Sequence, residues 1–356
     1  METRNRSGET GERSKILSDT IEISVRRTQK ITVPTLRVQG KNIIVKGRWI
    51  KTAIIHNEEW LETGLEDPEL CLEKLKQGPP CLRADLFTFV QKLPDVAARY
   101  SYPTEWESLA AVRVTSFNDW WNNLPQVTRK NVRRSQKRGV LVTVREFDDD
   151  LIKGIMEVNN DSPTVQGAPN PYCGRSFQEA KKDYSAFVGR SDFICAHFEG
   201  QLLGFLKLVY RGEIASILSF ISRADESDKR PANALIAKAV ELCQARGATY
   251  LTYGNYNYGN KRDSPLREFK IRNGFSEILT PRYYVPLTLW GALCLKLKVH
   301  RGLLGVLPHS VISAGVRLRR KWYSLTASNR RCSSTTERPN SNRQMGRSIP
   351  PAGSNP

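Results

Sequence analysis

The segment FICAHFEGQLLGFLKLVYRGEIASILSFI, residues 193–221, contains three apolar runs separated by two short polar interruptions. The interruptions lie at Glu199-Gly200 and Arg211-Gly212, where glycine allows the chain to turn tightly between two strands. This pattern predicts three consecutive β-strands, of which the first two form a hairpin.

Helices and strands are expected to alternate on both sides of this segment. A long helix is predicted over residues 231–247, because Pro231 stands in its first turn and Gly247 at its end. Further helices are predicted over 149–160, 176–188 and 265–274, and further strands over 141–147, 248–254 and 275–279. This order of elements predicts an α/β layer structure.

The first hundred residues predict a separate group of strands and helices. Short β-prone pieces between Ile21 and Ile55 predict a meander. Asn57 is expected to cap a helix that ends near Gly64, and a second helix is expected from Pro68 to the stop at Gly78. This part of the chain contains no motif that indicates chemistry.

A basic helix is predicted after this group. Apolar residues at helical spacing from Trp120 to Val127 lead into a run of lysines and arginines that ends at Gly139, which predicts one continuous helix. Arg129, Arg133 and Arg134 lie on it and are candidates for binding the phosphates of a substrate or of tRNA. The alternative is a helix face that only contacts water.

The charge of the chain indicates anionic partners. Lysine and arginine outnumber aspartate and glutamate by 55 to 36, which gives the 356 residues a formal net charge of +19. Phosphate-rich small molecules, nucleic acid and acidic membrane surfaces all fit such an excess. Hydrophobic residues make up 39% of the chain, which excludes disorder throughout.

Cysteine and histidine give no sign of a metal site. The seven cysteines form no CxxC pair and the four histidines are widely separated, so neither zinc nor a disulfide framework is expected. The N-terminus lacks an apolar signal region. The sequence also contains no run of about 18 apolar residues, so no membrane span is predicted. A soluble cytoplasmic protein without a metal is the resulting expectation.

The order of elements between Asp192 and Phe275 resembles the GNAT acyltransferase superfamily, in particular its FemAB-like branch of peptidoglycan aminoacyltransferases and BioF-like acetyltransferases. The pieces that carry the resemblance are FEGQLLGFLKL, ASILSFISRAD, RPANALIAKAVELCQARG, YLTYGN and REFKIRNGF, in that order. The resemblance covers about Phe117 to Tyr284 and implies a central mixed sheet flanked by helices, with an N-terminal α/β segment and C-terminal helices.

The expected organisation follows from this resemblance and from composition. It comprises a disordered start (1–18), an N-terminal α/β segment (19–108), a GNAT-like transferase domain (109–287), an amphipathic helical segment (288–323) and a disordered basic tail (324–356). The amphipathic segment either packs as a last pair of helices or lies on anionic lipid as an interfacial helix. The second alternative would place the protein at the inner face of the membrane.

The resemblance implies a donor site at the start of the helix over 231–247. In the superfamily, a glycine-rich loop there holds the pyrophosphate of the donor with backbone N–H groups. The corresponding residues are Lys229, Arg230, Ala232, Asn233 and Ala234, and the carbonyl of the donor would lie beside splayed strands near Phe220 and Ser222. The glycines are missing and Pro231 lacks an N–H, so acetyl-CoA, another acyl-CoA and a different activated donor all stay open. The alternative is an ordinary capped helix.

The resemblance also suggests catalytic residues. Lys270 occupies the position of a tyrosine that protonates the leaving group in many GNAT enzymes, and its ammonium can stabilise an oxyanion. The preceding Phe269 is a candidate for binding the substrate. Tyr253, Asn255 and Tyr256 follow a strand end and offer hydroxyl and amide groups for proton transfer. The alternatives are a surface lysine and an ordinary turn in which a tyrosine packs.

These residues predict an N-acyltransferase in which an amine attacks the acyl group of an acyl-CoA directly. The expected acceptor is an amine-bearing small molecule or peptide. One alternative is a Fem-like transferase that uses aminoacyl-tRNA and acts on a cell-wall precursor. Another is a non-catalytic module of the same fold that binds anionic surfaces.

Overall fold

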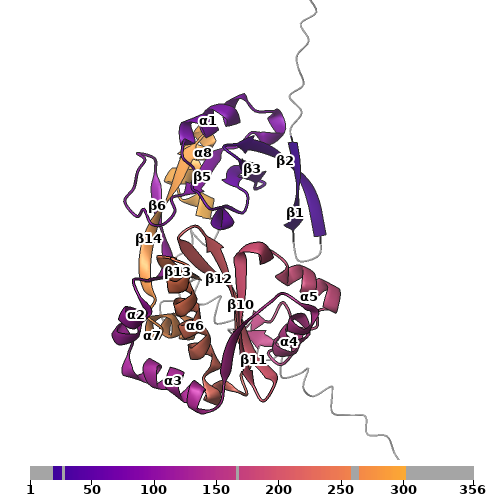
Figure 1. Ribbon diagram of the computed structural model, residues 1–356. Helices are drawn as coiled ribbons and strands as arrows, with labels where there is room; N and C mark the ends of the chain where they lie inside the picture. Colours follow the sequence, from indigo (N-terminus) through magenta and orange to yellow (C-terminus); the bar gives the residue numbers. More distant parts are fainter. Residues whose placement is uncertain (1–18, 26–28, 166–167, 258–263, 302–356) are drawn as a thin grey trace, which may run out of the picture. The chain divides into compact units, whose positions relative to one another are not determined.

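The computed structural model describes residues 19–25, 29–165, 168–257 and 264–301 (Figure 1). The segments predicted at 1–18 and 324–356, and the amphipathic segment beyond residue 301, lie outside the described residues.

A single large mixed sheet organises the described residues. Its twelve strands there have the order β1-β2-β3-β4-β5-β14-β6-β13-β12-β11-β10-β7. The strands are β1 (Asp19–Val25), β2 (Gln29–Val38), β3 (Lys41–Lys46), β4 (Thr52–Ile55), β5 (Leu86–Val90), β6 (Thr104–Arg113), β7 (Leu141–Arg145), β10 (Ser191–Phe198), β11 (Gln201–Arg211), β12 (Ile214–Ser222), β13 (Tyr250–Asn255) and β14 (Ser276–Pro286). A small separate hairpin consists of β8 (Thr164–Val165) and β9 (Ala168–Pro169).

Eight α-helices accompany the sheet in the described residues. They are α1 (Pro68–Gln77), α2 (Phe117–Asn123), α3 (Gln126–Lys137), α4 (Asp149–Asn160), α5 (Phe177–Tyr184), α6 (Pro231–Ala245), α7 (Pro265–Arg272) and α8 (Leu289–Lys296). Among the described residues, none of the helices is both long and apolar enough to cross a bilayer. The predicted mixed sheet with flanking helices is confirmed.

The three strands predicted from residues 193–221 form β10, β11 and β12. The β10–β11 hairpin turns at Glu199 and Gly200, which both have positive φ angles of 48° and 81°. Two successive positive φ angles are typical of the tight turn whose twist matches that of the paired strands. The predicted meander is also confirmed, because β1 to β4 pair consecutively and antiparallel.

The helix predicted after Asn57 is only a single 3-10 turn, Glu58–Trp60. Asn57 adopts the left-handed conformation and its side chain makes no capping bond. Instead, Glu58 fixes this segment from a distance, since its carboxylate accepts the N–H of Val90 at 2.7 Å and pairs with Arg282 at 3.2 Å. Long-range contacts therefore outweigh the local helix signal. The second predicted helix is confirmed as α1, which Asp67 caps.

The continuous helix expected before Gly139 is wrong. The chain breaks at Leu124-Pro125 into α2 and α3, and Leu124 is extended with ψ of 146°. Proline has no N–H and disfavours a helical conformation in the residue before it, which explains the break. The predicted stop is correct, because Gly139, the residue after the C-cap Arg138 of α3, has a φ of 83°.

Helices cover both faces of the sheet at β10 and β11. Ile194 and Leu206 pack with residues of α3 and α6 on one face, whereas Phe193 and Phe205 pack with α4 and α5 on the other. Figure 1 shows α6 against one face and α4 beside α5. Neighbouring residues of a strand point to opposite faces, so these strands are buried on both sides.

The first hundred residues join the same sheet. A third apolar core lies between α1 and strands β2 to β5, and it includes Tyr283 of β14. β14 pairs with β5 on one side and with β6 on the other. The domain boundary expected at residue 108 falls within β6, which pairs with β13 and so connects the two groups of strands.

Gly204→Ala is expected to destabilise the chain by about 1–3 kcal/mol, because β11 and β12 approach each other too closely there for a methyl group. A Cβ at Gly204 would lie 2.8 Å from the carbonyl oxygen of Ile221 and 2.8 Å from the Cβ of Ser222. Gly189→Ala is the control, since its Cβ would meet nothing within 4 Å. Urea unfolding measures both, and equal stabilities would contradict the close approach.

Candidate functional site

The sheet opens between β12 and β13. These parallel strands pair only at Ile214↔Tyr250, Ala215↔Leu251 and Ser216↔Thr252. Beyond this point the described pairing of β12 is with β11 alone, and that of β13 is with β6, which it contacts along its other edge from Tyr250↔Arg113 to Asn255↔Leu109. Residues 218–222 of β12 are half-buried. We call the space between the diverging strand ends the β12–β13 opening.

Irregularities in both strands produce this opening. The register of β11 and β12 shifts after Lys207↔Ser219, so that Leu208 faces Ile217 and Leu218 is an extra residue. The pairing of β13 with β6 shifts between Thr252 and Asn255. A bulge bends its strand and increases the local twist, so the two strand ends separate. The side chains of Ser216 and Thr252 close the base of the opening with a 2.7 Å hydrogen bond.

Lys270 of α7 holds the end of β13. Its ammonium donates to the carbonyl oxygens of Tyr253 at 2.6 Å and Asn255 at 2.8 Å, and it lies 4.4 Å from the centroid of the Tyr253 ring. The side chain is fully buried, and this burial lowers its pKa to about 8. The carbonyl groups of the diverging strand thus obtain charged donors in place of a neighbouring strand.

Aromatic rings fill the α7 side of the opening. The Phe220 ring lies 5.7 Å from that of Tyr253 in an edge-to-face arrangement and 5.8 Å from that of Phe269. Tyr256 is almost fully buried, with the Arg267 guanidinium 5.0 Å above its ring, so it packs into the core as one sequence alternative expected. The structure brings together Lys270, Tyr253, the carbonyl of Asn255, Phe220 and Phe269.

The start of α6 is attached to the end of α7. Asn233 donates from its side-chain amide to Asn273 at 3.0 Å, and the Trp120 indole donates to the carbonyl of Asn273 at 3.1 Å. The side chain of Asn233, predicted to bind the donor, is therefore engaged within the fold. Arg230 is the N-cap in a left-handed conformation, and no side chain caps α6.

The loop before α6 balances its own charges. Lys229 pairs with Glu226 and lies 4.7 Å from the Phe198 ring, while Asp228 pairs with Arg138 of the α3 end. Arg230 is exposed, Ala232 is half-buried and Ser222 ends β12 beside Gly204. The loop residues predicted to bind the acyl donor thus lie at the start of α6, and the carboxylates of Glu226 and Asp228 lie beside them.

The predicted phosphate-binding arginines lie on α3, which packs against α6. Arg129 donates to the carbonyl of Asn122 at 3.1 Å, Arg133 lies 5.4 Å above the Trp121 ring, and Arg134 is exposed. Arg133 and Ala234 both line a cavity of about 470 Å³ between α2, α3, β7 and α6. The arginines therefore neighbour α6 rather than the aromatic rings of the opening.

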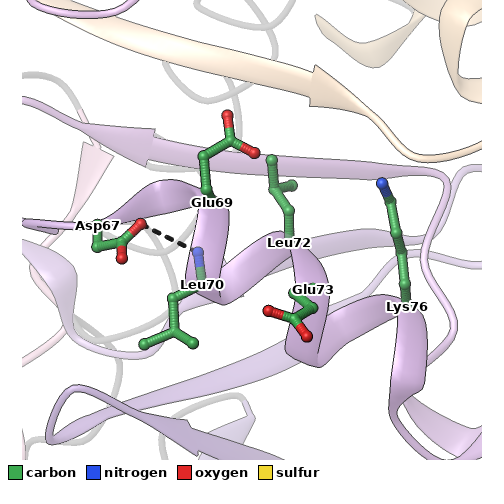
Figure 2. A pocket seen from close by; sticks show the side chains of 6 residues that line it. All are labelled: Asp67, Glu69, Leu70, Leu72, Glu73 and Lys76. Carbon is green, nitrogen blue, oxygen red and sulfur yellow. Dashed lines mark hydrogen bonds between the residues drawn. The ribbon is translucent and has the colours of Figure 1, made fainter.

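A second cavity, of about 370 Å³, lies along α1 (Figure 2). Asp67, Glu69, Glu73 and Lys76 line it together with two leucines. Asp67 is engaged as the cap of α1 through the N–H of Leu70 at 3.0 Å, and Glu69 accepts the hydroxyl of Tyr102. No predicted site residue lines this cavity.

Two buried polar residues escaped the sequence analysis. Lys207 of β11 is fully buried, donates to the carbonyl of Tyr184 at 2.6 Å and to that of Ala186, and has its pKa lowered to about 8 by burial. A single lysine within the apolar run FLKLVY was the available signal. Asn273 gave none, because asparagine before glycine is ordinary in a turn.

The part of the chain that the structure describes contains no candidate metal-binding cluster. No group of three or more His, Cys, Asp or Glu side chains there is arranged to hold an ion.

Comparison with solved structures shows the fold. FemX matches with a TM-score of 0.52 and 12% identity over 79% of this chain and 90% of the FemX chain. The C-terminal domain of a protein assigned as a lysylphosphatidylglycerol synthetase, from Agrobacterium fabrum, matches with a TM-score of 0.50 and 15% identity over 75% and 88% of the two chains. No family model and no curated protein matches the sequence. The predicted resemblance is confirmed as one of fold.

Lys270→Met is expected to make stability less dependent on pH between 8 and 10.5. Lysine titrates at 10.5 ordinarily and at about 8 in this folded site, so within that window the unfolded chain binds the extra proton. The stability of the wild type therefore rises with pH there, and the variant lacks this contribution. Urea unfolding at pH 8, 9 and 10 tests this, and parallel profiles for the two proteins would contradict the lowered pKa.

Proposed function

We propose that this chain is a transferase that moves an acyl group from an activated donor to an amine, with the reacting carbonyl in the β12–β13 opening. The observation that carries the proposal is the opening itself. There, parallel pairing stops after Ser216↔Thr252, and the edge of β12 beyond it is half-buried and faces no paired strand in the described residues. Backbone N–H groups along such an edge are suited to hold a carbonyl oxygen that becomes negatively charged.

The reaction is a direct displacement at the acyl carbon. The amine nitrogen forms a bond to that carbon, and the bond from the carbon to the sulfur or oxygen of the donor breaks. The proton lost by the amine passes to a base or to water, and the leaving group takes up a proton. Tyr253 is the proposed proton donor, because its half-buried ring borders the opening beside Phe220.

Lys270 is proposed as a positioning residue. Its ammonium bonds to the backbone of Tyr253 and Asn255, and it lies under the Tyr253 ring. This arrangement fixes where the phenol lies relative to the edge of β12. A displacement of about 1 Å at a reacting group can cost about 10²-fold in rate, so the proposed effect of Lys270 on catalysis acts through Tyr253.

Acyl-CoA is the donor that would use the start of α6. An acyl-CoA would place its pyrophosphate at the N–H groups of Ala232, Asn233 and Ala234, since no side chain caps this helix. The surrounding charges weaken that fit. Three carboxylates (Asp225, Glu226, Asp228) stand against three cations (Arg138, Lys229, Arg230), so the local formal charge is zero.

Aminoacyl-tRNA is the donor that the charges favour. The neighbouring α3 carries five basic residues (Arg129, Lys130, Arg133, Arg134, Lys137) and no acidic residue, and most of these side chains are exposed. A basic helix of this kind suits the extended phosphate backbone of a nucleic acid better than a single pyrophosphate. Among the solved proteins that share the fold are FemX and a protein assigned as a lysylphosphatidylglycerol synthetase. The basic helix and the lysyl group in the second name support an aminoacyl group as the one transferred.

Arg133→Gln/Arg134→Gln is expected to remove the thermal stabilisation of the full chain by tRNA. The stabilisation arises because tRNA binds the folded state, and it should weaken steeply as salt increases. Acetyl-CoA is measured in parallel with a Lys229→Ala/Arg230→Ala variant, which tests the start of α6 alone. Thermal unfolding in the presence of tRNA, acetyl-CoA or adenosine diphosphate gives the readout.

Each result decides between the donors. Stabilisation by tRNA that only the α3 variant loses supports the aminoacyl donor. Stabilisation by acetyl-CoA that only the loop variant loses assigns acyl-CoA instead. A chain that responds to neither donor, at low or high concentration, would contradict the proposed transferase.

A further inference from the structure

Helix α8 exposes its apolar side. It is capped by Thr288 and packs with Gly291 and Cys294, which are both buried. A Cβ at Gly291 would lie 1.9 Å from the carbonyl oxygen of Asp85, so only glycine permits this close contact. The docked face of α8 is thus fixed, and Leu289 and Leu293 lie on the exposed face, whereas Leu295 is half-buried.

Five large hydrophobic residues form the exposed surface that results. Leu289 is 91% exposed, Leu293 47% and Leu297 58%. Trp290 donates from its indole to the carbonyl of Trp49 at 3.2 Å, and Trp49, which lies between β3 and β4, is 86% exposed. We call Trp49, Leu289, Trp290, Leu293 and Leu297 the Trp49–α8 surface. Large apolar side chains gathered in this way are typical of an interaction site.

Basic side chains flank this surface. Lys46, Arg48 and Lys51 surround Trp49 in sequence, Lys296 and Lys298 lie at the end of α8, and all five are exposed. Neither residues 46–51 nor residues 289–301 contain aspartate or glutamate. The nearby Asp85 is engaged within the fold, because it accepts the hydroxyl of Thr288 at 3.0 Å and the N–H of Lys51 at 2.9 Å.

We propose that the Trp49–α8 surface binds a lipid bilayer that carries anionic headgroups. Tryptophan is favoured at the boundary between headgroups and acyl chains, and leucine beyond it. Lysine and arginine beside an inserted apolar face contact lipid phosphates, and each contributes to binding at an anionic surface. The combination of apolar centre and basic rim therefore complements this one occupant.

The charges argue against the other occupants. A second copy of the chain would bring an equally basic rim against this one. Residues 302–323 of the same chain add four cations (Arg317, Arg319, Arg320, Lys321) and no carboxylate. Like charges would oppose both contacts, whereas an anionic bilayer neutralises the rim. The proposal is independent of the donor and of the reaction in the β12–β13 opening.

The test measures binding of the full chain to vesicles by co-sedimentation. The vesicles contain either phosphatidylcholine alone or equal parts of phosphatidylcholine and phosphatidylglycerol. Trp49→Ser/Leu289→Ser/Leu293→Ser is expected to weaken binding to the anionic vesicles by about tenfold or more, because three inserted side chains are lost. Val127→Ser/Leu141→Ser is the control, since these residues are 59% and 67% exposed on α3 and β7. It is expected to bind like the wild type.

A second measurement distinguishes insertion of the Trp49–α8 surface into the bilayer from electrostatic binding of residues 301–356. Residues 301–356 contain ten basic residues and one acidic residue, so this segment by itself attracts anionic vesicles. Lipids brominated on their acyl chains quench tryptophan only when it enters the bilayer, and Trp49→Phe/Trp290→Phe should lose most of this quenching. Equal vesicle binding by the wild type and the Trp49→Ser/Leu289→Ser/Leu293→Ser variant would overturn the proposal, and so would an absence of quenching in the wild type. The proposal would also be overturned if the wild type formed a concentration-dependent dimer that the triple serine variant does not form, and did not bind vesicles.

Discussion

The bond of the Lys270 ammonium to the carbonyl oxygens of Tyr253 and Asn255 is the interaction on which the site depends. Parallel strands normally satisfy such carbonyls by pairing, and an unpaired buried carbonyl is costly. After Ser216↔Thr252, β13 has lost β12 as a partner. A buried ammonium supplies the missing donors, so the sheet can open without leaving these groups unsatisfied. The same side chain locates α7, and through Asn273 and Asn233 it locates the start of α6.

One strand relates the opening to the proposed membrane surface. β14 starts directly after Phe275, whose ring lies 5.9 Å from that of Tyr253. It pairs with β6 and β5 and ends at Pro286, shortly before α8 begins at Leu289. The residues proposed for catalysis and those proposed for lipid contact are therefore fixed by the same continuous sheet. An acceptor amine carried by a lipid would suit this arrangement.

Local signals predicted most of the fold, and long-range contacts account for the rest. The turn at Glu199-Gly200, the start of α6 at Pro231 and the end of α3 at Gly139 followed from residue types with one favoured backbone geometry. The turn after Asn57 did not, because Glu58 is held by Val90 and Arg282 far along the chain. In the site, Lys270 was identifiable through the family resemblance, but its burial was not. The carbonyl partners of Lys207, and which face of α8 stays exposed, depend on tertiary packing, which no spacing in the sequence encodes.

The most direct test compares two buried lysines. Lys270 and Lys207 are both fully buried, both bond to carbonyl oxygens, and burial lowers the pKa of each to about 8. Single-turnover transfer of the acyl group to a small primary amine is measured with the donor that stabilises the chain. Lys270→Met should lower the rate by about 10²-fold, whereas Lys207→Met should stay close to the wild-type rate at temperatures where both variants are folded. Equal rates in the two variants would contradict a reaction centred on the β12–β13 opening.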